Sequence, residues 1–194
     1  MAPIKPEELE RLKAAGRRMY EGGLAAGTLG AIGIRLSEGR VAVTAAGSRL
    51  GFLESSDFLT INDTRMMPVG QNGRAPAMDA GVLAAVLDAQ PGAGSVIRVL
   101  SPYATALAHR GGLFLEQSGE LLGNLGGVAF VPFYRRGTAG LAGAVAEALK
   151  TNRVAIIEGQ GPVVWGRDID DAVDHAEALE AAATVIFILS GKGV

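Results

Sequence analysis

The chain has 194 residues, of which 48% are hydrophobic and 20% are charged, and its formal net charge at pH 7 is −2. This length and composition predict one globular domain over residues 1–194 and exclude a disordered chain. The near-neutral charge argues against a nucleic-acid-binding surface. Cysteine is absent, which excludes disulfides and thiolate metal sites. With only two histidines, His109 and His175, a zinc site built from three histidines of one chain is excluded too.

The sequence carries no pattern of export or membrane insertion. Residues 1–10 are rich in charge and have no hydrophobic run of the kind that a signal peptide needs. No stretch approaches the roughly 18 consecutive apolar residues of a membrane helix. We therefore expect a cytoplasmic protein with no membrane partner.

The first half of the chain predicts one helix and one hairpin. Apolar residues at helical spacing, a proline in the first turn and a glycine pair at the end predict a helix over residues 6–22. Alternating apolar residues over 27–44, interrupted by a turn over 37–39, predict two paired strands. The stretch over 47–76 is rich in glycine and predicts no clear element.

The second half alternates between helical and strand patterns. The expected elements are a helix over 77–90, a strand over 95–100, a helix over 102–108, a strand over 128–133, a helix over 138–150, two strands over 153–157 and 163–165, and a last helix capped by Asp168. The apolar run over 184–189 is expected to be a core-facing helix segment or a strand. Helices that interleave with strands in one unit predict a three-layer α/β fold.

Five short segments stand at characteristic places along nearly the whole chain. They are Gly27-Thr28-Leu29-Gly30-Ala31-Ile32-Gly33-Ile34-Arg35, Thr44-Ala45-Ala46-Gly47, Pro76-Ala77-Met78-Asp79, Arg98-Val99-Leu100-Ser101-Pro102-Tyr103-Ala104-Thr105-Ala106, and Gly159-Gln160-Gly161. In this order they resemble the class II aldolase/adducin family, whose patterns are G-T-x-G-N-x-S-x-R, T-P-S-G, P-S-S-E, H-x-H-S-P-x-A-T-A and N-H-G. The resemblance implies a three-layer α/β/α fold with a central, mostly antiparallel sheet.

The resemblance also implies a chemistry. In that family a zinc ion is held by the two histidines of H-x-H and the histidine of N-H-G. The zinc polarises a ketose phosphate and stabilises the enediolate formed when a carbon–carbon bond breaks, while the carboxylate of P-S-S-E moves a proton. The first loop, the T-P-S-G turn and the serine pair bind the phosphate. The family's assembly is commonly a tetramer with sites between subunits, so we expect a homo-oligomer.

This chain departs from the family at the positions that carry the chemistry. The three metal-ligand positions hold Arg98, Leu100 and Gln160. Leucine cannot coordinate a metal, and arginine stays protonated and repels a divalent cation. The replaced phosphate-binding positions are Ala31, Gly33, Ala77 and Met78. We therefore expect no metal and no other cofactor.

The candidate site residues are those that can still hold or transform a small anion. We expect Asp79, at the family's carboxylate position, and Arg98, whose charge would replace that of the zinc, to be catalytic. The expected ligand-binding residues are Gly30, Thr44, Gly47, Arg98 and Gln160. A structural alternative is that Arg98 forms an ion pair with Asp79 or Glu158. Gln160, likewise, is alternatively a turn residue that hydrogen-bonds to the backbone.

Three functional hypotheses follow from this pattern. The first is a metal-independent protein that binds a small anionic metabolite, a carboxylate or a sugar phosphate, with lyase, decarboxylase or isomerase chemistry at Asp79. The second is a non-catalytic homologue with a scaffolding or regulatory role. The third is a zinc-dependent sugar-phosphate aldolase with unusual ligands. Loss of the metal ligands together with a new cation at one of their positions favours the first.

Overall fold

A computed structural model describes residues 4–61, 73–108 and 125–190 of the chain. Its helices and strands are, in order, α1 (Pro6–Glu21), β1 (Ala31–Arg35), β2 (Val41–Thr44), β3 (Phe58–Ile61), α2 (Ala80–Ala89), β4 (Ser95–Arg98), α3 (Pro102–Ala108), β5 (Val128–Val131), α6 (Ala139–Ala148), β6 (Val154–Ile157), β7 (Gly161–Gly166) and α7 (Ile169–Ser190). Three short 3-10 turns accompany them: η1 (Ser37–Gly39), η2 (Leu50–Phe52) and η3 (Ser55–Asp57).

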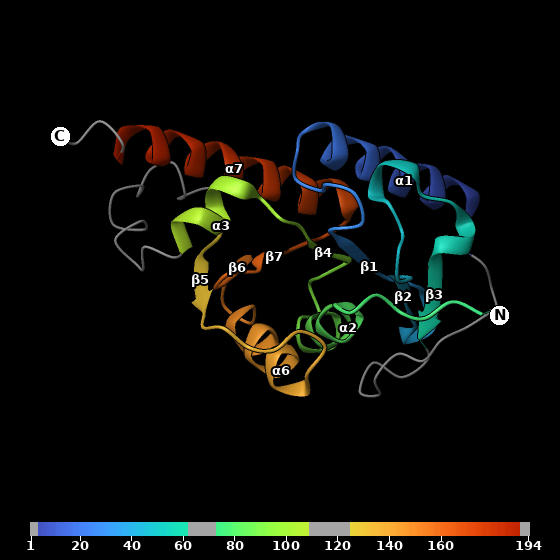
Figure 1. The fold of residues 1–194 in the computed structure, drawn as a ribbon. Coiled ribbons are helices and arrows are strands. Elements are labelled where there is room, and N and C mark those ends of the chain that lie inside the picture. The colour runs from blue at the N-terminus through green and yellow to red at the C-terminus, as the bar shows by residue number, and fades with distance from the viewer. Residues whose placement is uncertain (1–3, 62–72, 109–124, 191–194) are drawn as a thin grey trace.

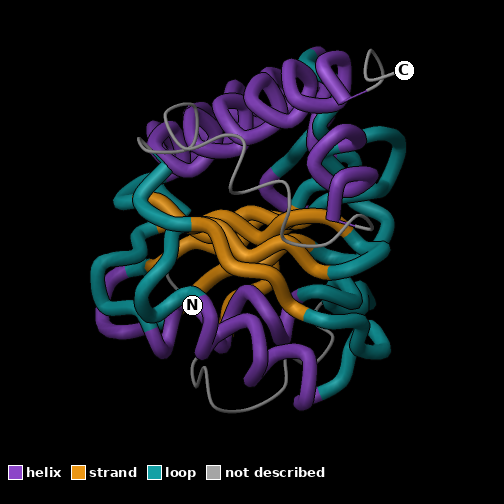
Figure 2. Tube along the Cα trace, turned by 90° about the vertical axis from the view of Figure 1, so that its left-hand side faces the viewer, coloured by secondary structure: helices purple, strands orange, loops and turns teal. Residues whose placement is uncertain are grey.

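The strands form one seven-stranded sheet in the order β3-β2-β1-β4-β7-β6-β5. Each neighbouring pair is antiparallel except β5 and β6, which run parallel. Figure 2 shows the sheet in edge view between two layers of helices. The expected three-layer α/β/α fold with a mostly antiparallel sheet is confirmed.

Two hydrophobic cores separate the sheet from its helices. In Figure 1, α1 and α7 lie side by side above the sheet, with α3 against α7, and α2 and α6 lie below it. Strand β6 serves both cores because successive side chains point to opposite faces. Val154 and Ile156 face the layer of α1, α3 and α7, whereas Ala155 and Ile157 face α2 and α6.

Several predicted boundaries shift for local reasons. Strand β3 lies within the stretch where the sequence predicted no element, and it pairs with β2 at the edge of the sheet. Helix α2 begins at Ala80 rather than at Ala77, because the preceding residues pair with the end of β2: the Ala77 N–H donates to the carbonyl of Thr44. The prediction that Asp168 caps α7 is confirmed, since its carboxylate accepts from the Asp171 N–H at 2.9 Å.

The apolar run over 184–189 is not simply core-facing, and it is not a strand. It forms the end of α7, where Ile186 is buried and Ile188 and Leu189 are 52% and 63% exposed. The prediction was wrong on this point because an α-helix turns part of any apolar run toward solvent. Phe187 lies edge-on to Tyr103 of α3, which covers one side of this end.

A row of ion pairs joins α1 to α7 on the outer surface. The pairs are Arg11 with Asp168 and Asp170, and Arg18 with Asp174 and Glu177. Their side chains are 35–63% exposed, so each pair contributes about 0–1 kcal/mol. The shared hydrophobic core beneath them therefore dominates the packing of these helices.

Within the described ranges, no helix is both long enough and apolar enough to cross a membrane.

Gly16 in α1 packs directly against η2, and Gly143 in α6 serves as a matched control. A Cβ atom at Gly16 would lie 2.1 Å from the Leu50 backbone oxygen, so the backbone would have to move. We expect Gly16→Ala to lower the free energy of unfolding by about 1–3 kcal/mol in urea denaturation. As a control, Gly143→Ala in α6 meets open space and should be neutral or stabilising by up to about 1 kcal/mol. Equal effects of the two substitutions would contradict the close contact.

The start of α7 makes stability depend on pH. The Asp171 carboxylate accepts from the Arg167 side chain and backbone N–H and from Arg153, and the Arg167 hydrogen bond above all holds the pKa of Asp171 well below its usual range. A depressed folded-state pKa stabilises the fold above the unfolded pKa of about 3.9, and this contribution is lost as the pH falls through the folded value.

We therefore expect the unfolding free energy of Asp171→Asn to fall less steeply than that of the wild type between about pH 5 and pH 2. Urea denaturation at a series of pH values measures the two slopes. Glu158→Gln, which removes an exposed carboxylate, is the control and should follow the wild type. Parallel curves for Asp171→Asn and the wild type would show that the hydrogen bonds do not depress this pKa.

Candidate functional site

Four segments that are distant in sequence meet at the α2 and α6 side of the sheet. Arg98 is the last residue of β4 and points to the same side as Val96, which lies in the core under α2 and α6. Asp79 immediately precedes α2, and Arg136 lies in the loop between β5 and α6. Gln160 lies in the turn between β6 and β7. The structure thus brings together Asp79, Arg98 and Gln160, while their roles in binding and catalysis stay predictions.

Asp79 lies between two guanidinium groups. Arg136 reaches both of its oxygens, with Nη2 at 2.6 Å from Oδ2 and Nε at 3.3 Å from Oδ1. Arg98 Nε lies 3.5 Å from Asp79 Oδ2, within ion-pair range. The side chains of Arg98 and Asp79 are only 4% and 5% exposed, whereas that of Arg136 is 34% exposed. Of the two carboxylates that the sequence offered as ion-pair partners of Arg98, the structure places Asp79 beside it. The other, Glu158, is exposed.

The buried guanidinium of Arg98 is held by the turn that contains Gln160. Its Nη2 donates a hydrogen bond to the backbone carbonyl of Gln160. Burial lowers the pKa of Arg98 below its usual range, the Asp79 charge opposes this shift, and the positive charge of Arg136 adds to it. Arginine nevertheless stays protonated, so the site keeps a positive charge out of water.

Two polar atoms in this cluster have no hydrogen-bond partner among the described residues. One is the N–H at Nε of Arg98, and the other is the side-chain oxygen Oε1 of Gln160. We call them the open donor and the open acceptor. Buried polar atoms without partners are uncommon in folded proteins, because each one loses its hydrogen bonds to water without replacement. Such atoms mark places where a ligand could complete the structure.

The position of Gln160 is set by the tightness of its turn. Gly161 has φ +95°, and a Cβ there would lie 2.6 Å and 2.7 Å from the carbonyl oxygens of Val99 and Leu100. The turn therefore packs directly against the chain that follows β4. The side-chain amide of Gln160 donates to the Tyr134 carbonyl at 2.5 Å, as expected for a turn residue that hydrogen-bonds to the backbone.

Of the other expected ligand-binding residues, Gly30 and Thr44 lie beside segments of this cluster, and no contact places Gly47 there among the described residues. Thr44 is buried, and its hydroxyl accepts from the Ile32 N–H at 3.1 Å, which ties β2 to β1. Gly47 is exposed with φ +76°, a conformation that favours glycine. A Cβ at Gly30 would lie 3.4 Å from the Arg98 carbonyl and 2.8 Å from a Leu50 methyl group. Their contacts are structural, and their role in binding stays a prediction.

The residues at the zinc-ligand positions do not fit the metal. Arg98 brings a positive charge and Leu100 brings a hydrocarbon side chain that cannot bind a metal. Only Gln160, among these three residues, has a side-chain oxygen that could bind a metal ion, and that oxygen is neutral. Within the described ranges, no group of three histidine, aspartate or glutamate side chains could hold a metal ion. His175 lies on α7, across the sheet, where its Nδ1 contacts the Asp171 carbonyl. His109 lies outside the described residues.

Arg136 is the member of the cluster that the sequence did not reveal. It belongs to the run Phe133-Tyr134-Arg135-Arg136, and nothing in the spacing of that run connects it to Asp79. A basic pair just before a predicted helix was the available signal. Only the fold, which packs α6 against α2, places Arg136 beside the carboxylate.

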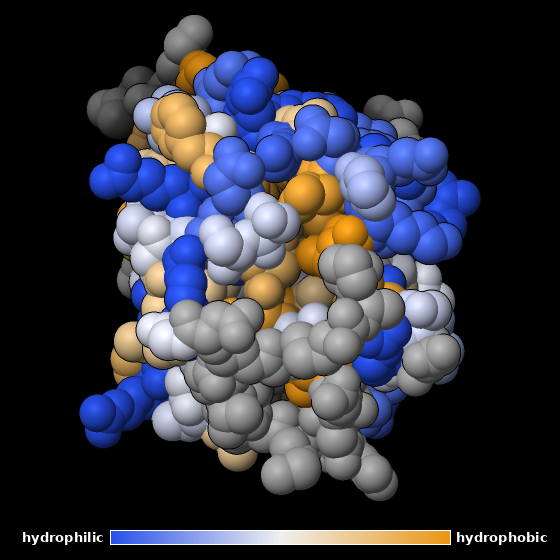
Figure 3. All heavy atoms as spheres, turned by 90° about the vertical axis from the view of Figure 1, so that its right-hand side faces the viewer, coloured by the Kyte–Doolittle hydropathy of each residue, from blue (hydrophilic) through white to orange (hydrophobic). Residues whose placement is uncertain are grey.

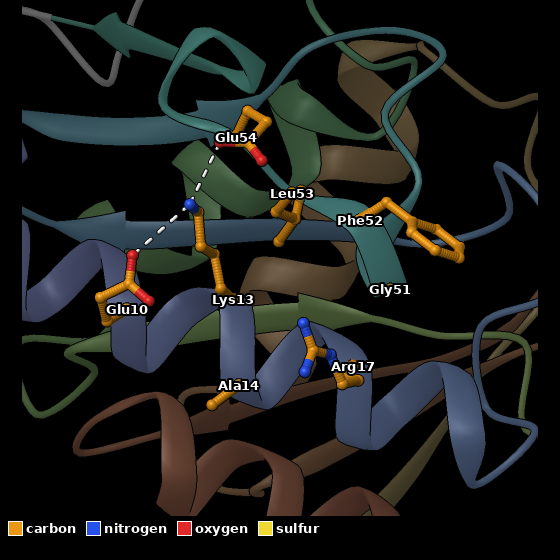
Figure 4. Close-up of a pocket in the computed structure, with 8 residues that line it drawn as sticks. All are labelled: Glu10, Lys13, Ala14, Arg17, Gly51, Phe52, Leu53 and Glu54. Carbon is orange, nitrogen blue, oxygen red and sulfur yellow. Dashed lines mark ion pairs between the residues drawn. The ribbon is translucent and has the colours of Figure 1, made fainter.

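A separate hollow of about 340 Å³ lies between α1 and η2. Figure 4 shows Lys13 reaching across its mouth to Glu10 and Glu54, with Arg17 and Phe52 at the side. Lys13 is thus already paired with acidic side chains at 3.4 Å and 3.1 Å. On the face seen in Figure 3, hydrophilic side chains cover much of the upper part.

We place the candidate site at Asp79 and Arg98 because two charged side chains are buried together there.

The buried ion pair predicts a difference between two aspartates that both contact arginine. Asp79→Asn leaves the Arg98 guanidinium buried without its carboxylate, so we expect a loss of about 3–5 kcal/mol in unfolding free energy. Asp174→Asn removes an exposed partner of Arg18 and should cost less than about 1 kcal/mol. Urea denaturation at pH 7 measures both. If the two losses are equal, Asp79 does not stabilise Arg98.

Known proteins are similar to this chain along most of its length. A family model described as the class II aldolase and adducin N-terminal domain matches residues 10–187. The 3-oxo-tetronate 4-phosphate decarboxylase of Haemophilus influenzae is 30% identical over 190 residues, which cover 95% of this chain and 89% of that protein. The methylthioribulose-1-phosphate dehydratase of Methylococcus capsulatus is 30% identical over 179 residues, which cover 86% of each chain.

Solved structures give the same result. YgbL from Escherichia coli superposes with a TM-score of 0.82 at 26% identity, covering 95% of this chain and 90% of that one. The L-fuculose-1-phosphate aldolase of Thermus thermophilus has a TM-score of 0.78 at 21% identity and covers 98% and 99% of the two chains, which shows a shared fold. Since the family model spans most of the chain and relatives match along nearly its whole length, this chain belongs to the class II aldolase and adducin family.

Proposed function

We propose that the protein is a metal-independent member of its family that binds a small anionic metabolite through Arg98 and carries out carbon–carbon lyase-type chemistry with Asp79. The observation that carries this proposal is the open donor: a buried, charged N–H at a position where the family places a metal ligand. A fixed guanidinium in a water-poor site stabilises a developing oxyanion strongly. It therefore supplies a positive charge where the family uses zinc.

The relatives support this class of reaction. They are named as a decarboxylase and a dehydratase, and both names refer to small phosphorylated substrates. We carry over from them only the class, a reaction at a carbon next to a carbonyl group of a small anionic substrate. The single domain over 1–194, the homo-oligomer and the cytoplasmic location stay predictions alongside it.

In the proposed cleavage, Asp79 accepts the proton of a hydroxyl group on the carbon that leaves. That oxygen forms the new carbonyl group, the carbon–carbon bond breaks, and its electron pair moves onto the carbonyl oxygen of the other fragment. The resulting enolate oxygen accepts hydrogen bonds from Arg98. Asp79 then returns the proton to the enolate carbon, so the carboxylate is regenerated. Decarboxylation gives the same enolate when carbon dioxide leaves, with the proton taken from water.

The second candidate function, a non-catalytic homologue, also rests on an observation. Asp79 already accepts two hydrogen bonds from Arg136 and lies 3.5 Å from Arg98 Nε, so the three charges can serve the fold alone. The open donor favours the first function over this one, because Arg98 Nε lies within ion-pair range of Asp79 but makes no hydrogen bond, and a buried donor without a hydrogen bond costs stability in a purely structural ion pair.

Titration of the chelator-treated protein with small carboxylates and sugar phosphates tests the proposal. We expect saturable binding that weakens at least about tenfold in Arg98→Ala, because a hydrogen bond to a charged group is worth about 1.5–3 kcal/mol. Arg17→Ala removes an arginine side chain from the hollow between α1 and η2 and should bind as the wild type does.

Two results would contradict the proposal. If no carboxylate or sugar phosphate binds and Arg98→Ala changes nothing, the non-catalytic alternative holds. If the purified protein contains stoichiometric zinc and loses ligand binding with the metal, the zinc-dependent alternative holds instead. Isothermal titration calorimetry and metal analysis on the same preparation distinguish these outcomes.

A further inference from the structure

The open donor and the open acceptor belong to two residues that contact each other, through the side chain of Arg98 and the backbone of Gln160. Arg98 donates to the backbone carbonyl of Gln160, so the guanidinium group that carries the open donor lies beside the residue that carries the open acceptor. The two residues are only 3% and 6% exposed. A buried hydrogen-bond donor and a buried hydrogen-bond acceptor are thus carried by contacting residues, both at positions where the family places a metal ligand.

The identity of the open acceptor is fixed by its neighbour. The amide of Gln160 contacts the carbonyl of Tyr134, and a carbonyl can only accept a hydrogen bond. The nitrogen of the amide must therefore face Tyr134, which leaves the oxygen Oε1 as the free end. A ligand that completes this end must donate a hydrogen bond, as a hydroxyl group does.

Charge decides what completes the open donor. Arg98 and Arg136 bring two positive charges to the single carboxylate of Asp79. Arg136 holds both oxygens of that carboxylate, and Arg98 Nε remains 3.5 Å away without a hydrogen bond to it. One further negative charge would balance the three groups. The ligand group that meets the open donor is therefore a singly charged oxyanion.

We propose that the site selects ligands with a hydroxyl group on the carbon next to the one that bears the anionic oxygen, of which a 2-hydroxycarboxylate is the simplest. The carboxylate accepts from the open donor of Arg98, and the hydroxyl group donates to the open acceptor of Gln160. This inference rests on the anion-binding function proposed above. The carboxylate oxygen takes the place of the enolate oxygen in that reaction.

Arg136 lies on the solvent-exposed side of this cluster. It is the most exposed member of the cluster, at 34% against 4% and 5% for Arg98 and Asp79. It holds both oxygens of the Asp79 carboxylate and so positions that group beside Arg98.

A ligand series tests this selection on the intact protein. Glycolate carries the hydroxyl group, fluoroacetate replaces it with a group of similar size that cannot donate, and acetate lacks it. We expect glycolate to bind at least about tenfold more tightly than the other two, because a site that pairs with a hydroxyl group rejects analogues without it. Ligand-observed NMR titration measures the three dissociation constants.

A matched pair of variants assigns the selectivity to Gln160. In Gln160→Met, the affinity ratio of glycolate to acetate should fall to about one. Gln90→Met removes another amide that donates to a backbone carbonyl, that of Leu149, and should keep the wild-type ratio. Because the ligand series uses the wild type, the inference remains testable even if Gln160→Met does not fold.

Each result has one meaning. Preference for glycolate that is lost in Gln160→Met supports the inference. Equal binding of the three acids overturns it and leaves the anion-binding function intact. Tighter binding of inorganic phosphate than of glycolate overturns the choice of a singly charged carboxylate. If none of these anions binds, the proposed function itself fails, and this inference fails with it.

Discussion

The burial of the Arg98 guanidinium beside Asp79 is the constraint on which the site depends. Taking an arginine out of water is costly unless other groups replace the lost hydration. In this fold the replacement is incomplete: Asp79 supplies charge, and the Gln160 carbonyl accepts one hydrogen bond. The remaining Nε–H of Arg98 has no acceptor within the described part of the chain. An anion that enters the site would complete the solvation of this group, which links the stability of the cluster to ligand binding.

The fold puts these groups together by ordinary packing. Alternation along β4 turns Arg98 toward the layer of α2 and α6, while Ile97 faces the other core. The end of β2 pairs with the residues before α2 and so places Asp79 beside the end of the central strand β4. The tight turn at Gly161 holds Gln160 against the end of β4. Each of these features comes from a segment in which the family pattern is kept around a changed functional residue.

Most of the fold could be predicted from the sequence, because hydrophobic periodicity and turn residues carry it. The helices and most strands follow these patterns, and the resemblance adds the layer order. Strand β3 escaped prediction because its four residues lie in a glycine-rich stretch and gain their strand conformation from pairing with β2. The site was only partly predictable: family positions pointed to Asp79, Arg98 and Gln160. Arg136 comes from a loop whose position depends on tertiary packing, which no local pattern encodes.

We propose that Arg98 holds an anion where the family holds a metal. A crystal structure of the protein grown with saturating glycolate and no added metal tests this proposal. We expect a carboxylate oxygen within hydrogen-bond distance of Arg98 Nε and the hydroxyl group at Gln160 Oε1. A metal ion bound at Gln160 and Asp79, or no ligand at Arg98 under saturating glycolate, would contradict this proposal.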